Sequence, residues 1–597
     1  MTIVAMQRIT LCGLAAEKSA ALDGLQALGV VHLIPLKQPG SLEPIDPVMR
    51  RRAETAFRHI ATSPEKMRPY RPGKAFDLEA VVGDIIANHT ELRTLSDRRD
   101  ELTAQIRALE PWGDFALPSP EALAGQKMWL YALPVKDRAA LDKIDQPWAI
   151  VGREPTALHV VVVSHEEPPV TLLPVLRLTT GAEPLSALKA EIEELEIAYE
   201  KAAAARTELT RWRILLGADL AAAQDLDELR EVAEQTHDED VIYALQGWAP
   251  EESMPALTAL ADEHGLALVI EAPGPGEQPP TLLRQGNDRF AIAGDLTNFY
   301  TSPGYRAWDP SFVVFTAFAI FFAMILADAG YAALLGLGAA FFWRKMGKTP
   351  AGRRFRTLLA SLSAAAFVYG VAAGSYFGFP PPEGSFLAKL HVIDVTNFQK
   401  MMVVSVVLGA AHISIALLAA AYFSTGKGKA VAALGWVTVI AGGLLLWLGE
   451  GTARTVGGFT IAAGLAAVFL GNASDRPVNS PKDWLLRITD GMLGLTGVTK
   501  LFGDILSYLR LFALGLASAS LAATFNEMAL NVQTSTPGLG VLLLILILLF
   551  GHAINIVIGI MSGVVHGLRL NYIEFFGWGL TEEGYPFRAF SKRENPT

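Results

Sequence analysis

Two long apolar stretches near the C-terminal end dominate the pattern of hydrophobic and polar positions. They cover residues 492–530 and 540–577 and are joined by the uncharged turn Asn531–Leu539. A helix of about 38 residues is roughly 57 Å long, which is nearly twice the hydrocarbon thickness of a bilayer, ~30 Å. The pattern therefore predicts two long transmembrane helices that tilt steeply or protrude from the membrane.

Polar and small residues recur every three or four positions along each stretch, so they share one helix face. In the first stretch these are Asp504, Ser507, Arg510, Ala513, Ala517, Ser520, Thr524 and Glu527; in the second they are His552, Asn555, Gly559, Ser562, His566 and Arg569, followed by Glu574. An arginine keeps its charge in a protein, and a charge at membrane depth costs at least ~2.5 kcal/mol. Arg510 and Arg569 are therefore expected to face polar groups, although the Ser, Thr and Gly positions alone would also suit simple helix packing.

Six further apolar stretches precede this pair, at residues 311–327, 331–343, 355–378, 400–422, 430–449 and 455–471. Lys and Arg concentrate in cytosolic loops, and the loop 344–356 is strongly basic. The later loops alternate in the same way: Lys427 and Lys429 inside, 379–399 outside, Arg476, Lys482 and Arg487 inside, 531–539 outside, and Lys592 and Arg593 inside. The pattern predicts eight crossings of the membrane with both termini cytosolic.

This topology assigns a side to each polar residue of the two long helices. The first helix runs outward, which places Asp504 on the cytosolic side of Arg510, and Ser520, Thr524 and Glu527 on the outer side. The second runs inward, which makes His552 and Asn555 outer, and His566, Arg569 and Glu574 inner. Two polar pockets that open to opposite faces are typical of offset ion half-channels and not of an open pore.

Two further candidates lie in the earlier apolar stretches. Asp328 is at the turn before Gly330, where a channel residue and a helix cap are equally good interpretations. His412 is surrounded by apolar residues, and both a proton carrier and a packed, hydrogen-bonded histidine fit that position.

The first 290 residues have the pattern of a soluble region. The strand-like segments Met6–Gly13 and Val30–Pro35 flank a helical pattern that stops at Gly29, and a matching β-α-β pattern runs from Val241–Gly247 to Leu266–Ile270. Two such halves, about 200 residues apart, predict one ferredoxin-like α+β lobe completed by distant segments.

Heptad patterns over residues 78–109 and 185–216 predict an antiparallel coiled coil, with a second small α/β lobe at its tip. The predicted fold class is thus an α-helical membrane domain of about eight transmembrane helices, two of them long and tilted, preceded by a cytosolic α+β dumbbell with a coiled-coil strut. The predicted domains are 1–290 and 291–597, with the segment Pro273–Pro280 as the hinge between them.

Composition agrees with a membrane protein that also has a soluble region. Of 597 residues, 51% are hydrophobic and 18% charged, and Met1–Gly40 lacks the isolated apolar core of a signal peptide. The net charge of −10 gives no electrostatic case for nucleic acid. Cys12 is the single cysteine, which excludes internal disulfides and a multi-cysteine metal site, and we expect no metal or cofactor.

The segments Asp504–Ala519 (DILSYLRLFALGLASA) and His566–Phe576 (HGLRLNYIEFF) resemble the signatures of subunit a, or subunit I, of the rotary V/A-type ATPases. Supporting matches are LADAGY at 326–331, YGVAAGSYFG at 369–378, LGAAH at 408–412 and GHAIN at 551–555. The resemblance covers the whole chain. Two positions depart from eukaryotic relatives, since Thr496 replaces a glutamate and Ser518 a histidine, which suggests a prokaryotic type located in the plasma membrane.

The resemblance implies a stator subunit of a rotary ATPase. Arg510 would meet the buried carboxylate of each subunit of a rotating proteolipid ring, Arg569 would assist from the cytosolic side, and the dumbbell would bind the peripheral stalks. The central stalk and the ATPase head would be reached through the complex, and ion translocation, of protons or sodium, would be coupled to ATP hydrolysis or synthesis.

Two observations limit the other interpretations. Gly347–Thr349 resembles the end of a phosphate-binding loop, but the first glycine of that motif is replaced by Phe342, so we expect no ATP site in this chain. The alternative function is a secondary transporter, which also buries charges at mid-membrane. That class predicts inverted repeats, and the arginine pair has no second copy in the sequence.

Overall fold

The computed structural model describes residues 3–37, 46–71, 73, 77–114, 121–169, 172–175, 177–178, 184–284, 291–395, 397–424, 426–474, 480–535, 538–580 and 582–593. These residues form two compact units, one from Met1–Leu36 and Asp238–Phe590 and the other from Lys37–His237 and Ser591–Thr597. The predicted domain border at residue 290 and the loop residue Arg476 both lie outside the described residues.

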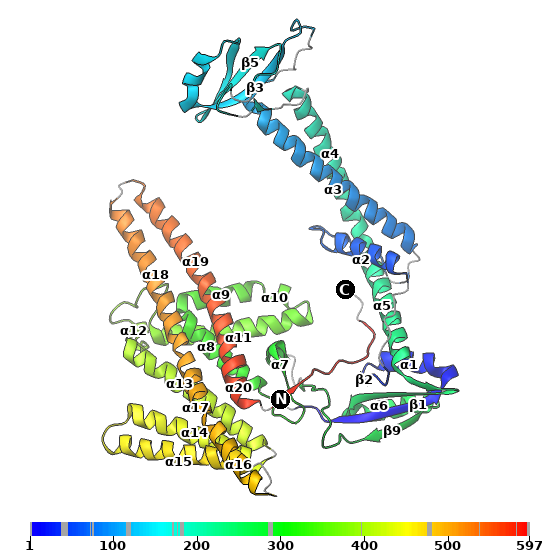
Figure 1. Cartoon of the computed structure of the whole chain (residues 1–597), viewed down its shortest axis with the longest axis vertical. Helices are drawn as coiled ribbons and strands as arrows, with labels where there is room; N and C mark the ends of the chain where they lie inside the picture. The colour runs from blue at the N-terminus through cyan, green and yellow to red at the C-terminus, as the bar shows by residue number, and fades with distance from the viewer. Residues whose placement is uncertain are drawn as a thin grey trace. The chain divides into compact units, whose positions relative to one another are not determined.

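The first unit opens with the predicted ferredoxin-like lobe. Its sheet has the order β2-β8-β1-β9, and these strands are β1 (Met6–Leu14), β2 (His32–Ile34), β8 (Ile242–Pro250) and β9 (Ala267–Glu271). β1 is antiparallel to both β8 and β9, so the two ends of the soluble region lie side by side (Figure 1). The helices are α1 (Lys18–Leu28), which ends at the left-handed Gly29 as predicted, and α6 (Met254–Glu263).

The second unit contains the predicted helical strut. α3 (Leu78–Leu109) and α4 (Leu185–Leu209) are antiparallel, because Asn88 contacts Ala202 while Arg98 pairs with Glu191. The second heptad stretch is shorter than predicted, since the chain tightens into a 3-10 turn at Thr210–Trp212 before α5 (Arg213–Gln235). The helix α2 (Pro47–Ala61) was not predicted; it begins at the capping residue Asp46 and packs on α3 and α5.

The second unit also holds the second predicted α/β lobe. Its sheet has the order β4-β5-β3-β6, formed by β3 (Lys127–Pro134), β4 (Trp148–Arg153), β5 (Ala157–Ser164) and the short β6 (Arg177–Leu178). The α+β lobes and the antiparallel helix pair confirm the predicted fold class of the soluble region.

The rest of the first unit is helical and apolar. Among the described residues, six helices are long and apolar enough to cross a membrane: α11 (Pro350–Ala373), α13 (Phe398–Phe423), α14 (Lys427–Leu448), α15 (Thr452–Ser474), the run Pro481–Ser535 and the run Gly540–Gly579. Two shorter apolar helices, α8 (Ser311–Leu326) and α9 (Ala329–Phe341), meet at the predicted turn. The tilt of the long helices and the number of crossings stay predictions.

The first long span differs from its prediction at both ends. It begins at Pro481 and not at residue 492, because Ser480 and Asp483 form a capping box in front of that proline. It is divided into α16 (Pro481–Leu495), α17 (Gly497–Ser507) and α18 (Leu509–Ser535) by tight i→i+3 hydrogen bonds at Thr496 and Tyr508. α18 continues to Ser535, so the predicted turn 531–539 is partly helical.

The second long span is α19 (Gly540–Arg569), followed by a π-helical turn at Leu570–Phe575 and the short α20 (Phe576–Gly579). α18 and α19 lie side by side (Figure 1). α8 packs against both, and a Cβ added at Gly563 or Gly567 of α19 would touch phenylalanine rings of α8.

Candidate functional site

Arg510 lies in the first turn of α18 and Arg569 is the last residue of α19. Arg510 is half-buried, and its Nη1 atom is buried with no hydrogen-bond partner among the described residues. Arg569 is exposed. The two guanidinium groups are close enough to repel each other, and both attract Glu574. The structure thus brings together the two arginines and one acid from the predicted inner pocket.

Glu574 lies in the π-helical turn that follows Arg569. The side chain is 2% exposed, and its Oε2 atom has no hydrogen-bond partner in the described part of the chain. A π turn adds one residue to a helical turn, and such turns are frequent at functional sites. His566, the remaining inner candidate on α19, lies near both arginines, and its buried Nδ1 is likewise unpartnered among these residues.

Asp504 on α17 contacts the end of the second span. Its Oδ2 atom accepts a hydrogen bond of 2.7 Å from Trp578 Nε1. One turn earlier, Lys500 donates to the carbonyl of Gly577 (3.1 Å) and lies over the Trp578 ring. These contacts fix α17 against α20 and place Asp504 within electrostatic reach of Glu574.

His412 on α13 is 4% exposed and lies in an aromatic cage. Its ring stacks on Phe575 at 4.3 Å, meets Phe321 edge to face and bonds Tyr508 Oη through Nδ1 (2.8 Å). The other ring nitrogen, Nε2, is buried without a partner among the described residues. His412 is therefore both packed and half-satisfied, so neither of the two predicted roles is excluded.

The outer candidates His552 and Asn555 belong to a chain of hydrogen bonds that links α9, α18 and α19. Asn555 Nδ2 donates to the carbonyl of Ser518 (2.9 Å) and to Tyr331 Oη (3.0 Å). His552 Nε2 donates to Asn526 Oδ1 (3.0 Å), because an amide oxygen can only accept; Nδ1 of the neutral imidazole therefore accepts from the Tyr331 hydroxyl (2.7 Å). Each member fixes the orientation of the next one.

Asp328 anchors the loop beside this chain of hydrogen bonds. It is the N-cap of α9, and its carboxylate accepts hydrogen bonds from the amides of Tyr331 (3.0 Å), Phe377 (3.0 Å) and Gly378 (2.9 Å) and from the Ser375 hydroxyl (2.6 Å). Phe377 has a φ of 53°, a left-handed conformation that costs energy for a bulky residue. The geometry is that of a helix cap that also holds a strained loop.

A cavity of about 480 Å³ lies against His552 and Tyr331. Its other walls are apolar, with Leu334, Phe377 and Leu549 among them. His552 and Tyr331 are thus the polar residues of an otherwise apolar lining.

The remaining outer candidates lie on a different face of α18. Ser520, Thr524 and Glu527 are exposed, as are Ala513 and Ala517, whereas Leu511, Gly515, Ser518, Ala522 and Asn526 are buried on the opposite face. Ser507 on α17 bonds its own helix, through Gly503 O, and Thr524 does the same through Ser520 O. The predicted polar stripe exists, but its outer half does not face His552 and Asn555.

Sequence reasoning missed Tyr331, Ser518 and Asn526 as members of this site. Ser518 and Asn526 lie two helical turns apart, with Ala522 between them. This spacing places them on one helix face, so the sequence could have predicted a second polar face. The partnership of Tyr331 with Asn555 joins residues 224 positions apart, which no local pattern signals.

Among the described residues, no group of three or more His, Cys, Asp or Glu side chains could hold a metal ion.

Comparisons with known proteins give one consistent family. The model of the V-type ATPase 116kDa subunit family matches residues 502–592. The chain is 30% identical over 383 residues to V-type ATP synthase subunit I of Borreliella burgdorferi, an alignment that covers 60% of this chain and 61% of that protein. It is 26% identical over 644 residues to V-type ATP synthase subunit I 1 of Treponema pallidum, covering 99% and 100%.

The A-type ATP synthase subunit I of Methanocaldococcus jannaschii is 28% identical over 401 residues, with 60% of this chain and 56% of that protein covered. Among solved structures, the cytoplasmic N-terminal domain of subunit I, a homologue of subunit a of V-ATPase, is similar at 18% identity and a TM-score of 0.25, covering 44% of this chain and 99% of that domain. The chain thus aligns with about three fifths of the first and third relatives and with the full length of the second.

Proposed function

Because the chain belongs to the V-type ATPase 116kDa subunit family, we propose that it is the stator membrane subunit of a rotary V/A-type ATPase. It provides two ion half-channels and the arginine that faces the proteolipid ring, and it couples ion translocation to ATP hydrolysis or synthesis. The membrane is the prokaryotic plasma membrane, with both termini cytosolic. ATP chemistry belongs to other subunits.

The observation that carries this proposal is the uncovered face of α18. Arg510 shares this face with Ala513, Ala517, Ser520 and Thr524, and this chain leaves those four exposed. Small residues allow another helix to approach closely. Nη1 of the half-buried Arg510 is buried without a hydrogen-bond partner among the described residues, and a change of rotamer would offer this donor to a carboxylate from outside the chain. A ring of proteolipid helices, each with one buried carboxylate, matches both the shape and the charge of this face.

Arg510 would act on each ring carboxylate by favouring its ionised form, as an opposite charge does. The carboxylate would lose its ion to one half-channel, and it would regain one from the other after nearly a full rotation. The positive charge of Arg510 would also block a direct leak between the two paths. Lysine is a poor substitute because its compact ammonium lacks the planar fork that can hold a carboxylate at two points.

The two half-channels would lie on opposite sides of Arg510. His566, Arg569, Glu574 and Asp504 would form the inner one, where the buried Glu574 provides the acid nearest both arginines. His552 and Asn555, with Tyr331, would form the outer one beside the apolar cavity. In the soluble region, lobes and a helical strut without a ligand signature favour binding of the peripheral stalks.

The test is Arg510→Ala in the reconstituted complex. We expect ATP-driven ion transport into vesicles to fall to the leak rate, while the variant still co-purifies with the ring and the ATPase head. Arg510→Lys should retain little transport. Arg454→Ala removes an exposed arginine at the start of α15 and serves as the matched control with normal transport. Normal transport in Arg510→Ala would end the proposal.

A further inference from the structure

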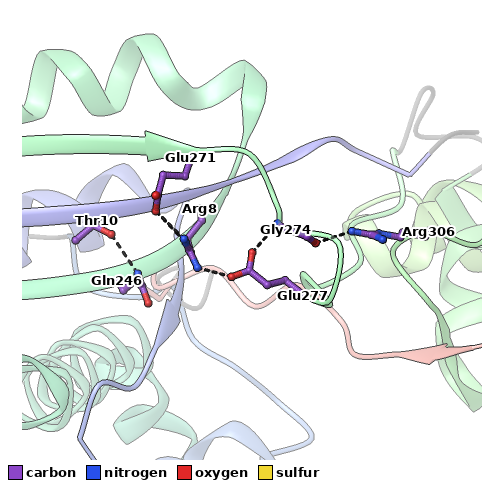
Figure 2. A network of polar contacts seen from close by, with 7 residues as sticks. All are labelled: Arg8, Thr10, Gln246, Glu271, Gly274, Glu277 and Arg306. Atoms are coloured by element: carbon purple, nitrogen blue, oxygen red, sulfur yellow. Dashed lines mark hydrogen bonds and ion pairs between the residues drawn. The ribbon is translucent and has the colours of Figure 1, made fainter.

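The linker at Pro273–Pro280 contains a tight turn that is held by charged groups on one side. Arg8 on β1 donates to Glu271 Oε2 through Nε (3.1 Å) and Nη2 (2.7 Å), and through Nη1 to Glu277 Oε1. Glu277 Oε2 in turn accepts the backbone N–H of Gly274 (2.8 Å). Figure 2 shows Arg8 between the two acids, one at the end of the sheet and one in the linker.

On its other side, the turn is held by Arg306, which lies between β10 (Ser302–Pro303) and α8. Its guanidinium donates to the carbonyl oxygens of Gly274 (2.6 Å) and Pro275 (2.8 Å). Gly274 is therefore held from both sides, its N–H by Glu277 and its carbonyl by Arg306 (Figure 2). The linker was predicted to be a hinge, but it is held by two arginines of the same unit, one from the N-terminal strand β1 and one from the segment that leads into α8.

Backbone hydrogen bonds and an apolar cluster lie next to these arginine contacts. Val4 N donates to Leu282 O (2.9 Å) just after the linker, and Met6 N donates to Tyr305 Oη (2.9 Å) just before Arg306. Val4 and Met6 are buried with Trp248 in a small apolar cluster that also contacts Leu282 and Tyr305. The N-terminal strand and the segment leading into α8 thus share a core beside the linker.

The C-terminal segment adds a third contact. Thr281 exchanges backbone hydrogen bonds with Tyr585 (2.8 Å) and Phe587 (3.0 Å), and Phe590 N donates to Val31 O (2.7 Å). His32 of the edge strand β2 accepts the backbone N–H of Arg588 (3.0 Å). The strand that begins near Val4 and the segment 585–590 therefore both contact residues 281–282, which directly follow the linker.

We propose that Arg8, Glu277 and Arg306 form a clasp that holds the linker Pro273–Pro280 in one conformation, so that it transmits force between the N-terminal lobe and the membrane helices. The part of this inference that concerns force rests on the proposed function, because a stator must resist the torque of a rotor. The part that concerns the linker's conformation stands independently of it.

The strength of the clasp should depend on salt concentration. Ion pairs that are partly exposed contribute little individually and are screened by salt. An arginine that binds two carboxylates at once gains from geometry that lysine cannot reproduce. The clasp should therefore hold the linker at physiological ionic strength and loosen as salt rises, while the apolar cluster keeps the lobe in place.

The first test is hydrogen exchange of the linker amides in the full chain in lipid nanodiscs. We expect Arg8→Gln and Glu277→Gln each to speed exchange at Gly274 about fivefold. The double variant should be no faster than the faster single one, because both remove the same clasp. Arg8→Lys should resemble Arg8→Gln.

Lys18→Gln is the matched control, since it removes another ion pair of the same lobe, with Asp238, and should leave linker exchange unchanged. The clasp is overturned if neither Arg8→Gln nor Glu277→Gln changes exchange at Gly274. It is equally overturned if the unmodified linker already exchanges at the rate of an unprotected chain.

The second test uses the assembled complex with Arg8→Gln. We expect fewer ions to be moved per ATP hydrolysed, with the rate of hydrolysis itself unchanged. The reason is that a flexible linker would let the membrane helices move with the rotor, so part of each rotational step would not drive ion transport. An unchanged ratio together with faster linker exchange would overturn the force-transmitting role. If the unmodified complex moves no ions at all, the proposed function fails while the clasp, measured by exchange, stands.

Discussion

At the scale of single residues, buried polar side chains divide into satisfied and unsatisfied ones. Asp328 accepts four hydrogen bonds within the chain, and Asn555 has a donor or acceptor partner at each end of its amide. Glu574 and His412 each keep one buried polar atom without a partner among the described residues. Buried polar atoms are costly when left unpaired, and Arg510 and His566 share this property with Glu574 and His412, so the unsatisfied atoms of the membrane helices include four of the predicted site residues.

A buried histidine of α2 gives a prediction of pH dependence. His59 is 8% exposed and bonds Asn88 Oδ1 through Nε2 (3.0 Å). Burial lowers the pKa of His59, and the bond to Asn88 offsets this only in part. Because the unfolded state binds the proton more tightly, this contribution to stability is present above pH ~6.5 and is lost as the pH falls below it.

We therefore expect hydrogen exchange in α2, corrected for intrinsic exchange chemistry, to accelerate between pH 7.5 and 5.5 in the full chain. His59→Gln should flatten this dependence, because glutamine can still donate to Asn88 but does not titrate. The exposed His237 offers a control, since His237→Gln should leave the dependence intact. A profile in α2 that is the same with and without His59 would contradict the assignment.

At the scale of secondary-structure elements, close backbone contact between helices requires glycine. α14 and α15 contact each other along Gly435, Gly442, Gly457 and Gly464. A Cβ added at Gly464 would lie 2.8 Å from the carbonyl oxygen of Gly435 and 2.9 Å from the amide of Val439, both backbone atoms that cannot move aside cheaply. The two helices behave as one hairpin because nothing larger than hydrogen separates them at these points.

Gly464→Leu should force α14 and α15 apart and destabilise the chain by about 1–3 kcal/mol, the usual cost of overpacking. Gly458→Leu provides the matched control, because a Cβ at Gly458 of the same helix meets nothing within 4 Å. Thermal unfolding of the two variants in one detergent separates the outcomes. Equal midpoints for both would mean that the hairpin does not depend on this contact.

At the scale of the whole molecule, membrane orientation stays a prediction from loop charge. Cysteine at Thr524 should react with a membrane-impermeant thiol reagent added from outside, and cysteine at His566 only from the cytosolic side. The experiment needs a Cys12→Ser background, since Cys12 is the single native thiol. Both positions are at least partly exposed within the chain, so labelling reports membrane side and not burial. Reversed reactivity would overturn the eight-crossing topology.

Features of the fold and of the site were predictable from the sequence where they are determined by residues close together in the chain. The face that carries Arg510 follows from a 3.6-residue period and is present on α18. The split lobe was predictable because each half keeps its own β-α-β pattern. The breaks at Thr496 and Tyr508 and the π turn before α20 were not, because nearby glycines and apolar residues continue a helical pattern through them.

Contacts between distant segments were the least accessible to sequence reasoning. Asp328 fitted a cap and a channel residue equally well until the loop containing Ser375, Phe377 and Gly378 was placed around it. The linker Pro273–Pro280 was predicted to be a hinge from its glycines and prolines alone. Its contacts with Arg8 and Arg306 depend on side chains 269 and 32 residues away along the chain, which the composition of the linker does not reveal.

The uncovered face of α18 also bears on how such a protein is made. A newly inserted copy would carry the half-buried Arg510 and a row of exposed small residues at the membrane depth that the proposed function assigns to them; Glu574 attracts this guanidinium, but its Nη1 atom has no hydrogen-bond partner among the described residues. A cation at that depth costs at least ~2.5 kcal/mol until a partner arrives. Copies that have not assembled would thus expose this face of α18 to degradation machinery. Their cellular half-life should increase when more of the chain that covers this face is present. Biogenesis and quality control would then depend on the same arginine to which the proposed function assigns ion translocation.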